Sequence, residues 1–176
     1  MAGALDFEGV VARYYEPLYR FAFGLTRAEA DACDLTQQTF YVWATKGHQL
    51  RDTTKVKTWL FTTLHRQFLE SRRRQTRFPH QELESVEYEL PAISPAAASG
   101  LDTAQVLHAL AQVDELYQAP VALCYLEGCA YKEIAEILDV PIGTVKSRIA
   151  RGIGQLQKIL ADDLAAEKHP KEPDRD

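Results

Sequence analysis

The stretch YKEIAEILDVPIGTVKSRIARG, residues 131–152, has the pattern of two short helices around a tight turn. Apolar residues recur at spacings of three and four on both sides of the turn segment DVPIG, residues 139–143. Pro141 suits the first turn of the second helix, and Asp139 tolerates the backbone conformations of a turn. The small side chain of Ala135 lets the second helix cross the first closely. The pattern therefore predicts a helix-turn-helix.

The second helix of this motif carries a polar and basic face. If Val145 and Ile149 face inward, the outer positions are basic, hydroxyl-bearing or small, and no acidic residue occurs at positions 140–161. Arginine can bind guanine through two hydrogen bonds in the major groove, whereas lysine and serine more often contact phosphates. The pattern favours DNA binding over an ordinary solvated surface helix.

The first helix of the motif lacks an N-terminal cap. Position 130, where Ser or Thr would pair with Glu133 in a capping box, is Ala. The missing cap should cost about 1 kcal/mol of stability, and we expect a frayed start to this helix.

The formal net charge of −5 would repel DNA if it were spread evenly. Counted by segment, residues 46–80 hold nine basic and two acidic side chains, and residues 128–160 hold five and three. Residues 81–127 between them hold eight acidic side chains and no Lys or Arg. Two positive segments are thus separated by a strongly negative one, which indicates more than one kind of partner.

Length and composition bound the class of protein. A chain of 176 residues with 46% hydrophobic and 26% charged residues suits one globular domain or two small ones. No apolar run is long enough to cross a membrane, and the N-terminus does not have the pattern of a secretion signal. Three cysteines without a CxxC pair argue against a disulfide framework or a zinc site. We expect a cytoplasmic protein without a membrane segment of its own.

Helical periodicity dominates the chain and strand signals are almost absent, so we predict an all-α fold of two small helical domains. The first, residues 5–80, contains an apolar run interrupted at Pro17, where we expect a kink or two abutting helices. A helix over residues 29–46 follows, and Asp52, Thr53 and Thr54 are candidate caps for the next. Residues 81–100 read as a flexible acidic linker, residues 101–162 as the second domain and residues 163–176 as a disordered tail.

The segment KVKTWLFTTLHRQFLESRRRQTR, residues 55–77, combines basic and aromatic side chains on one predicted helix. Basic groups can follow a nucleic-acid backbone, and aromatic faces can stack on unpaired bases. Two of the aromatic residues, Trp59 and Phe68, have the alternative of packing in a core. Part of the basic run SRRR is also explained by the preference for cations at a helix C-terminus.

Three motifs together resemble the RNA polymerase sigma factors of the extracytoplasmic-function type, group 4 of the sigma-70 family. DACDLTQQTFYVWA is similar to region 2.2, TWLFTTLHRQFLESRRR to regions 2.3 and 2.4, and EGCAYKEIAEILDVPIGTVKSRIARG to region 4.2. The resemblance covers about residues 5–80 and 100–160. It implies a region 2 helical bundle and a region 4 helix-turn-helix on either side of the linker.

The resemblance also implies site residues. Those for polymerase binding are Asp34, Leu35, Gln37, Gln38, Thr39 and Phe40. Those for the −10 element and DNA melting are Arg51, Lys55, Lys57, Trp59, His65, Arg66, Arg72, Arg73 and Arg74. Those for the −35 element are Thr144, Lys146, Ser147, Arg148, Ala150 and Arg151.

The implied partners are core RNA polymerase, through the clamp helices and the flap of its large subunits, promoter DNA, and an anti-sigma factor. No catalytic residue, cofactor, metal or small-molecule substrate is implied. The chain departs from the family pattern at His65-Arg66, where an Arg-Asn pair is common, and at Gln38, where Glu is common. Pro120 also falls inside the expected region 4.1 helix.

Two alternatives remain open at this point. A stand-alone helix-turn-helix transcription regulator would bind DNA tightly without polymerase, and a sigma-mimicking regulator would bind polymerase without opening DNA. An enzyme is disfavoured, because the five histidines are scattered and neither a paired-carboxylate site nor a phosphate-binding loop is present in the sequence.

Overall fold

The computed structural model describes residues 6–77 and 103–168, and over these ranges the chain is helical, without strands, as predicted. The first unit consists of α1 (Phe7–Thr26), α2 (Glu29–Lys46), the short 3-10 helices η1 (Gly47–Gln49) and η2 (Thr53–Lys55), and α3 (Val56–Arg77). The second unit consists of α4 (Thr103–Leu110), α5 (Glu115–Tyr125), α6 (Tyr131–Leu138) and α7 (Ile142–Lys168). The predicted linker, residues 81–100, lies outside the described residues.

The first unit is held by apolar side chains that α1, α2 and α3 bury between them. Phe21 of α1 and Phe61 of α3 are fully buried, with ring centroids 5.3 Å apart. The prediction of two abutting helices at Pro17 was wrong, because α1 runs through this residue. Leu18 is buried directly after Pro17. Packing of the buried face offsets the hydrogen bond that proline cannot donate.

The loop between α2 and α3 is fixed by aromatic packing and by one cap. A Cβ added at Gly47 would lie 2.6 Å from Cδ2 of Trp43, so this position accommodates only glycine without movement. Trp43 packs edge-on against Trp59 of α3, with ring centroids 5.1 Å apart. Of the three candidate caps, the structure selects Asp52, whose carboxylate accepts a hydrogen bond from the Thr54 backbone N–H at 3.0 Å.

The helix-turn-helix predicted from the opening stretch is formed by α6 and α7. Asp139 adopts the left-handed conformation at the turn, with φ 54°, as its tolerance of turn geometry suggested. Gly152 sets the approach of α7 to α5, since a Cβ there would lie 2.5 Å from Cγ2 of Val121. Pro120 is buried inside α5, as the sequence indicated.

The start of α6 retains half of a capping box. The Glu133 carboxylate accepts a hydrogen bond from the Ala130 backbone N–H at 2.9 Å, whereas Ala130 supplies no side-chain acceptor in return. As predicted, the N-cap side chain is missing at Ala130. The helix α6 nevertheless begins at Tyr131.

The C-terminal helix is longer than the sequence indicated. Residues 163–168, which were assigned to a disordered tail, continue α7 as helix, so that part of the prediction was wrong. The run LAAE, residues 164–167, consists of strong helix formers that extend a helix already started by packing. Residues 169–176 lie outside the described residues.

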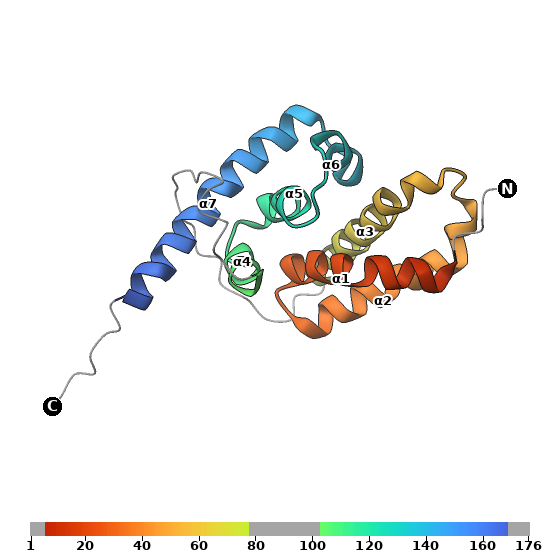
Figure 1. The fold of residues 1–176 in the computed structure, drawn as a ribbon, viewed down its shortest axis with the longest axis horizontal. Helices are drawn as coiled ribbons and strands as arrows, with labels where there is room; N and C mark the ends of the chain where they lie inside the picture. The colour runs from red at the N-terminus through yellow and green to blue at the C-terminus, as the bar shows by residue number, and fades with distance from the viewer. Residues whose placement is uncertain (1–5, 78–102, 169–176) are drawn as a thin grey trace.

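The two units pack directly against each other (Figure 1). α6 lies beside α3, and α4 and α5 lie against α1, so the buried apolar residues of both units form one continuous core. Gly24 of α1 marks the close approach of α4, because a Cβ at this position would lie 3.3 Å from Cδ2 of Leu110. The arrangement places parts of the predicted −10 and −35 faces next to each other.

Candidate nucleic-acid interface

The predicted polymerase-binding motif on α2 divides into a buried and an exposed face. Leu35, Thr39 and Phe40 are buried and pack the helix against its neighbours. The Thr39 hydroxyl also donates to the Leu35 carbonyl at 2.8 Å and contacts the Gln67 amide oxygen at 3.1 Å. A surface contact with a partner therefore falls to the exposed members of the motif, which are Asp34, Gln37 and Gln38.

Tyr41 extends this exposed face of α2 and was missed in the sequence analysis. Its side chain is 70% exposed, the largest value among the exposed large apolar residues of the described chain. Residues 34, 37, 38 and 41 follow the i, i+3, i+4, i+7 spacing that aligns side chains on one helix face. This spacing could have predicted from the sequence that Tyr41 shares the exposed face of the motif.

A groove of about 340 Å³ runs along the same side of the first unit, between α2 and α3. Asp34 and Gln38 of α2 and Arg72 of α3 are among its lining residues. Asp34 and Gln38 therefore border a concave surface, as expected of side chains that receive part of a partner helix.

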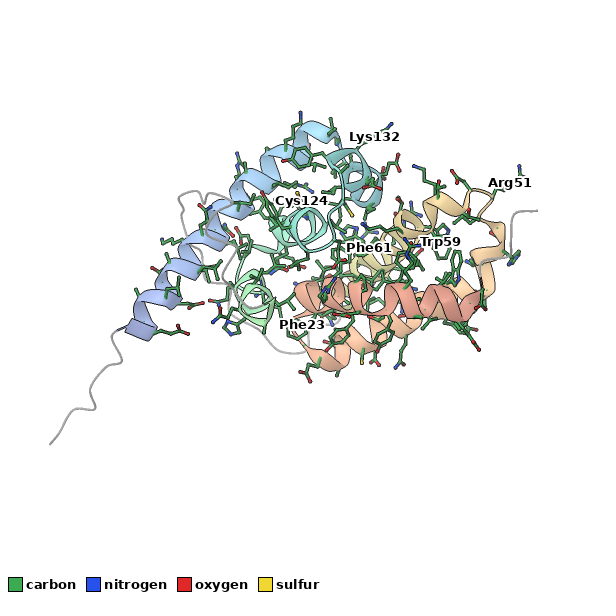
Figure 2. The ribbon with its side chains drawn as sticks, viewed as in Figure 1. Phe23, Arg51, Trp59, Phe61, Cys124 and Lys132 are labelled. Carbon is green, nitrogen blue, oxygen red and sulfur yellow. The ribbon has the colours of Figure 1, made fainter. Side chains whose placement is uncertain are left out.

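The outer side of α3 carries a stripe of residues from the predicted −10 set, of which both arginines face solvent. Trp59, Arg66 and Arg73 are spaced by seven residues and share one helix face. Both arginines are exposed, and neither has an ion-pair partner among the described residues. Arg51, also exposed, lies in the loop before α3, at the end of the molecule away from α7 (Figure 2).

The aromatic residues of α3 take two different places. Phe68 is buried in the core at 5% exposure, which settles the alternative left open by the sequence. Trp59 is partly buried against the core, and its ring packs edge-to-face with the ring of Trp43. The part of Trp59 that remains exposed is a candidate surface for contact with a base.

Three other cations of the predicted −10 set contact the second unit, although the side chains of Lys55 and Arg72 remain 50% and 53% exposed. Lys57 donates to the backbone carbonyl of Glu127 at 2.6 Å, and Lys55 lies 3.3 Å from the Glu136 carboxylate. The side-chain contacts of Arg72 are bidentate, with Nε and Nη2 lying 2.9 and 2.6 Å from the two carboxylate oxygens of Glu115. Among the described residues, Arg74 pairs with Glu70 of its own helix, at 4.0 Å.

His65 lies where the two units meet. Burial, together with the positive charge of Arg148, lowers the pKa of His65 to about 4, so its imidazole is neutral near pH 7. His65 belongs to the predicted −10 set and Arg148 to the predicted −35 set. In this conformation α6 packs against α3, and the charge of Arg148 in the predicted −35 set acts on His65 in the predicted −10 set.

The rest of the predicted −35 set lies along the first turns of α7. Lys146, Ser147, Ala150 and Arg151 are exposed, while Thr144 is half-buried. The Ser147 hydroxyl donates to the Thr144 carbonyl at 3.1 Å, one turn earlier in the helix. The exposed members leave one side of the second helix of the helix-turn-helix open to solvent.

A carboxylate at the unit boundary carries a perturbed pKa. Glu127 has a side chain that is 4% exposed, and both of its oxygens lie 3.4 Å from nitrogens of Arg20. Burial raises the pKa of Glu127, although Arg20 and Lys57 act in the opposite direction. The ion pair with Arg20 therefore does not fully offset the removal of this carboxylate from water.

Over the described residues, no group of three or more His, Cys, Asp or Glu side chains could hold a metal ion. In the same ranges, no helix has the length and apolar character needed to cross a membrane. The three cysteines are free thiols.

Comparison with known proteins accounts for both units. Residues 10–78 match the family Sigma-70 region 2, and residues 103–156 match Sigma-70 region 4. The ECF RNA polymerase sigma factor SigE of Mycolicibacterium smegmatis is 32% identical over 166 residues, covering 89% of this chain and 62% of the relative. RNA polymerase sigma factor SigV of Bacillus subtilis is 22% identical over 156 residues, covering 88% of this chain and 92% of the relative.

The structural comparison agrees with the sequence comparison. The sigma factor RpoE from Bartonella quintana, solved in complex with the anti-sigma factor NepR, superimposes with a TM-score of 0.73 at 29% identity. The match covers 91% of this chain and 99% of RpoE. These comparisons lend no support to a stand-alone regulator or to a sigma-mimicking regulator. The chain belongs to the sigma-70 family, in its extracytoplasmic-function group of RNA polymerase sigma factors, the proteins that direct transcription initiation.

Proposed function

We propose that this sigma factor binds core RNA polymerase through the exposed face of α2 and then presents two DNA-binding surfaces to a promoter. The observation that supports this most is the presence, on one chain, of two unlike basic surfaces: an aromatic and basic stripe on α3 and the second helix of a helix-turn-helix. The groove beside Asp34 and Gln38 provides a concave edge for the clamp helices.

For the −10 element, we propose that α3 and the preceding loop hold separated strands. Trp59 offers a ring held by Trp43, on which an unpaired base can stack. Arg51 of the preceding loop and Arg66 and Arg73 of α3, all exposed, supply charge for the phosphates. Melting then requires no catalytic residue, because binding energy spent on extruded bases favours the open duplex.

For the −35 element, we propose that the first turns of α7 enter the major groove. Arg148 and Arg151 are suited to guanine edges, and Lys146 and Ser147 to phosphates. Ala150 offers a small apolar contact. In the described conformation α6, the first helix of the helix-turn-helix, packs against α3, so this proposal requires the second unit to separate from α3 before both elements are bound.

The proposed partners are core polymerase, promoter DNA and an anti-sigma factor, in a cytoplasmic setting. RpoE, the structural relative, was solved with the anti-sigma factor NepR, and this supports a partner of the same class for the present chain. On polymerase, each DNA-binding unit acts at high effective concentration, so two individually weak contacts give a specific complex.

Run-off transcription tests this function directly. Core polymerase is combined with the purified chain and fragmented genomic DNA of the source organism, and the transcript start sites are mapped. We expect discrete starts that require the chain, and loss of these starts when Arg148 and Arg151 are replaced by Ala while core binding persists. Core binding without any chain-dependent start site would contradict the proposal.

A further inference from the structure

A hydrogen-bonded pair joins α7 to the turn that precedes α5. Gln155 of α7 is 7% exposed, and both polar atoms of its side-chain amide bind Asp114. The Gln155 Oε1 accepts from the Asp114 backbone N–H at 2.7 Å, and the Gln155 Nε2 donates to Oδ2 of Asp114 at 3.1 Å. Because two bonds are made, the pair fixes both the position and the direction of this part of α7 relative to α5.

Asp114 makes this contact in place of a local one. It occupies the N-cap position of α5, where an aspartate commonly accepts a hydrogen bond from a backbone N–H of the first helical turn. Among the described residues its side chain makes no such bond. The turn that carries Asp114 is held by Gln118, which is fully buried and donates to the Val113 carbonyl at 2.7 Å. Asp114 therefore presents its carboxylate to α7 from a fixed support.

Gly152 provides a second fixed point on α7. A Cβ at Gly152 would lie 2.5 Å from Cγ2 of Val121 and 2.8 Å from Cβ of Tyr117, so the backbone of α7 lies directly against α5 here (Figure 1). Gly152 and Gln155 are three residues apart and share one face of the helix. Contact at Gly152 alone would let α7 tilt about that point, and the bonds of Gln155 restrain the tilt.

The predicted −35 residues lie on the N-terminal side of these two points. From Gln155 to Thr144 the axis of α7 runs about 16 Å, at a rise of about 1.5 Å per residue. A tilt of about 5° at Gln155 would therefore move Thr144 by about 1.4 Å, which is more than the range of distances that a hydrogen bond tolerates. Recognition of base edges by Arg148 and Arg151 depends on such distances.

Resting on the proposed −35 role of α7, we propose that Gln155 is a positioning residue: held by Asp114, it sets the angle at which the first turns of α7 present Arg148 and Arg151 to the −35 element. Gln155 acts through these arginines and not by touching DNA. Loss of its bonds leaves the arginines on their helix but lets the helix take a different angle. Discrimination between promoter sequences then falls while the fold persists.

An exchange of groups across the pair tests this role without shortening a side chain. Gln155→Glu places a carboxylate oxygen opposite Oδ2 of Asp114, and the two oxygens repel each other. Asp114→Asn alone keeps the pair, because its amide oxygen still accepts from Gln155, so this variant is the matched control. Combining the two substitutions restores the bond with donor and acceptor reversed. The double variant also keeps the net charge of the unmodified chain, since one carboxylate is removed and one is added.

The angle of α7 is measured in the free full-length chain by the distance between two spin labels. The labels are placed at Leu116→Cys on α5 and Ile142→Cys at the start of α7, both exposed, in a chain whose native cysteines are replaced by Ala. We expect Gln155→Glu to change the mean distance by about 2 Å, as a tilt of about 5° over this length of helix predicts. Asp114→Asn should leave the distance unchanged, and the double variant should restore it. Circular dichroism verifies that all variants are folded.

The effect on recognition is measured with core polymerase on two promoter duplexes that differ only in the −35 element. The promoter is taken from the start sites mapped with the unmodified chain. We expect Gln155→Glu to lower the preference for the native −35 element about fivefold, and the double variant to regain it. A residue that only stabilised the fold would weaken binding to both duplexes equally and leave the preference unchanged.

The two measurements separate this inference from the proposed function. An unchanged distance in Gln155→Glu, or a double variant that does not restore it, would overturn the positioning role whether or not the chain initiates transcription. A changed distance with an unchanged −35 preference would also overturn it, because the angle would then not matter to recognition. Failure of the unmodified chain to direct any start site would contradict the proposed function, and the −35 part of this inference with it, while the spin-label distances still decide whether Gln155 sets the angle of α7.

Discussion

The outer and inner sides of α3 carry the same kinds of side chain in opposite circumstances. On the outer side, Arg66 and Arg73 are solvated and have no ion-pair partner among the described residues. On the inner side, Arg72 binds a carboxylate of the second unit, and His65 has a pKa lowered to about 4. The comparison shows that a basic sequence predicts DNA binding by a helix. The packing of the helix decides which of its cations are unpaired and can contact DNA.

The largest expected effect comes from the outer side. Replacing Arg66 and Arg73 with Ala should reduce open-complex formation by the holoenzyme about 100-fold, since each hydrogen bond to a charged phosphate is worth on the order of 1.5–3 kcal/mol. Permanganate footprinting of the melted strand measures this. The matched control replaces Lys46 and Lys132, two exposed cations outside the predicted sets, with Ala. Equal loss in the control would contradict a specific role for the outer stripe.

A smaller effect is expected where the loop before α3 is fixed. In Gly47→Ala the new Cβ would lie 2.6 Å from the Trp43 ring, and the resulting overpacking should lower the free energy of unfolding by about 2 kcal/mol. Urea denaturation gives the value. Gly143→Ala is the control, because a Cβ there has nothing within 4 Å, and it should be neutral or slightly stabilising. Equal behaviour of both variants would mean that Trp43 moves freely.

The inner side of α3 should show its own pH dependence. The folded pKa of His65 is lowered from 6.5 to about 4, so its contribution to stability is present above pH 6.5 and is lost as pH falls toward 4. The free energy of unfolding should fall by about 1 kcal/mol more between pH 7 and pH 5.5 in the unmodified chain than in His65→Gln. Denaturation at both pH values measures the difference.

The unmodified chain must be compared with His65→Gln, because Glu127 changes the free energy of unfolding with pH in the opposite direction from His65. Its raised pKa favours the folded state as pH falls, and this contribution is present in both chains and cancels in the comparison. If the free energy of unfolding changed with pH by the same amount in the unmodified chain and in His65→Gln, the result would contradict the burial of a neutral imidazole between the units.

The smallest expected effect tests the start of the helix-turn-helix. Ala130→Ser supplies the missing half of the capping box opposite Glu133, and it should raise the free energy of unfolding by about 1 kcal/mol. Ala130→Gly serves as the comparison, because it adds no acceptor. A stability gain from Ser no greater than that from Gly would show that the Glu133 half suffices.

Much of the fold followed from spacing in the sequence. The helix over residues 29–46, the turn at Asp139 and the inward face of α3 were all predictable, because helical periodicity and turn chemistry are local properties. Packing overrode two local signals, since α1 continues through Pro17 and α7 continues past residue 162. Tyr41 could have been found from its spacing along α2.

The remaining part of the site depended on contacts between distant segments. The ion pairs Arg72–Glu115 and Lys55–Glu136 join residues that are far apart in the sequence. The residue spacing within one segment cannot predict which residue of the other segment it will contact. Helical periodicity already placed Leu35 and Thr39 on the inward face of their helix, and both are buried, although the resemblance assigned them, with Phe40, to polymerase binding. The sequence thus predicted the candidate functional segments, and the structure distinguished their buried side chains from their exposed ones.

The distance between the two units, measured by fluorescence energy transfer, tests the central claim most directly. Dyes are placed at Ala12→Cys on α1 and Lys132→Cys on α6, two exposed positions, in a chain whose native cysteines are replaced by Ala. We predict efficient transfer in the free chain and a clear loss of transfer when core polymerase and promoter DNA are added. Unchanged transfer in a transcriptionally active complex would contradict the claim that the second unit must leave α3 for DNA to bind.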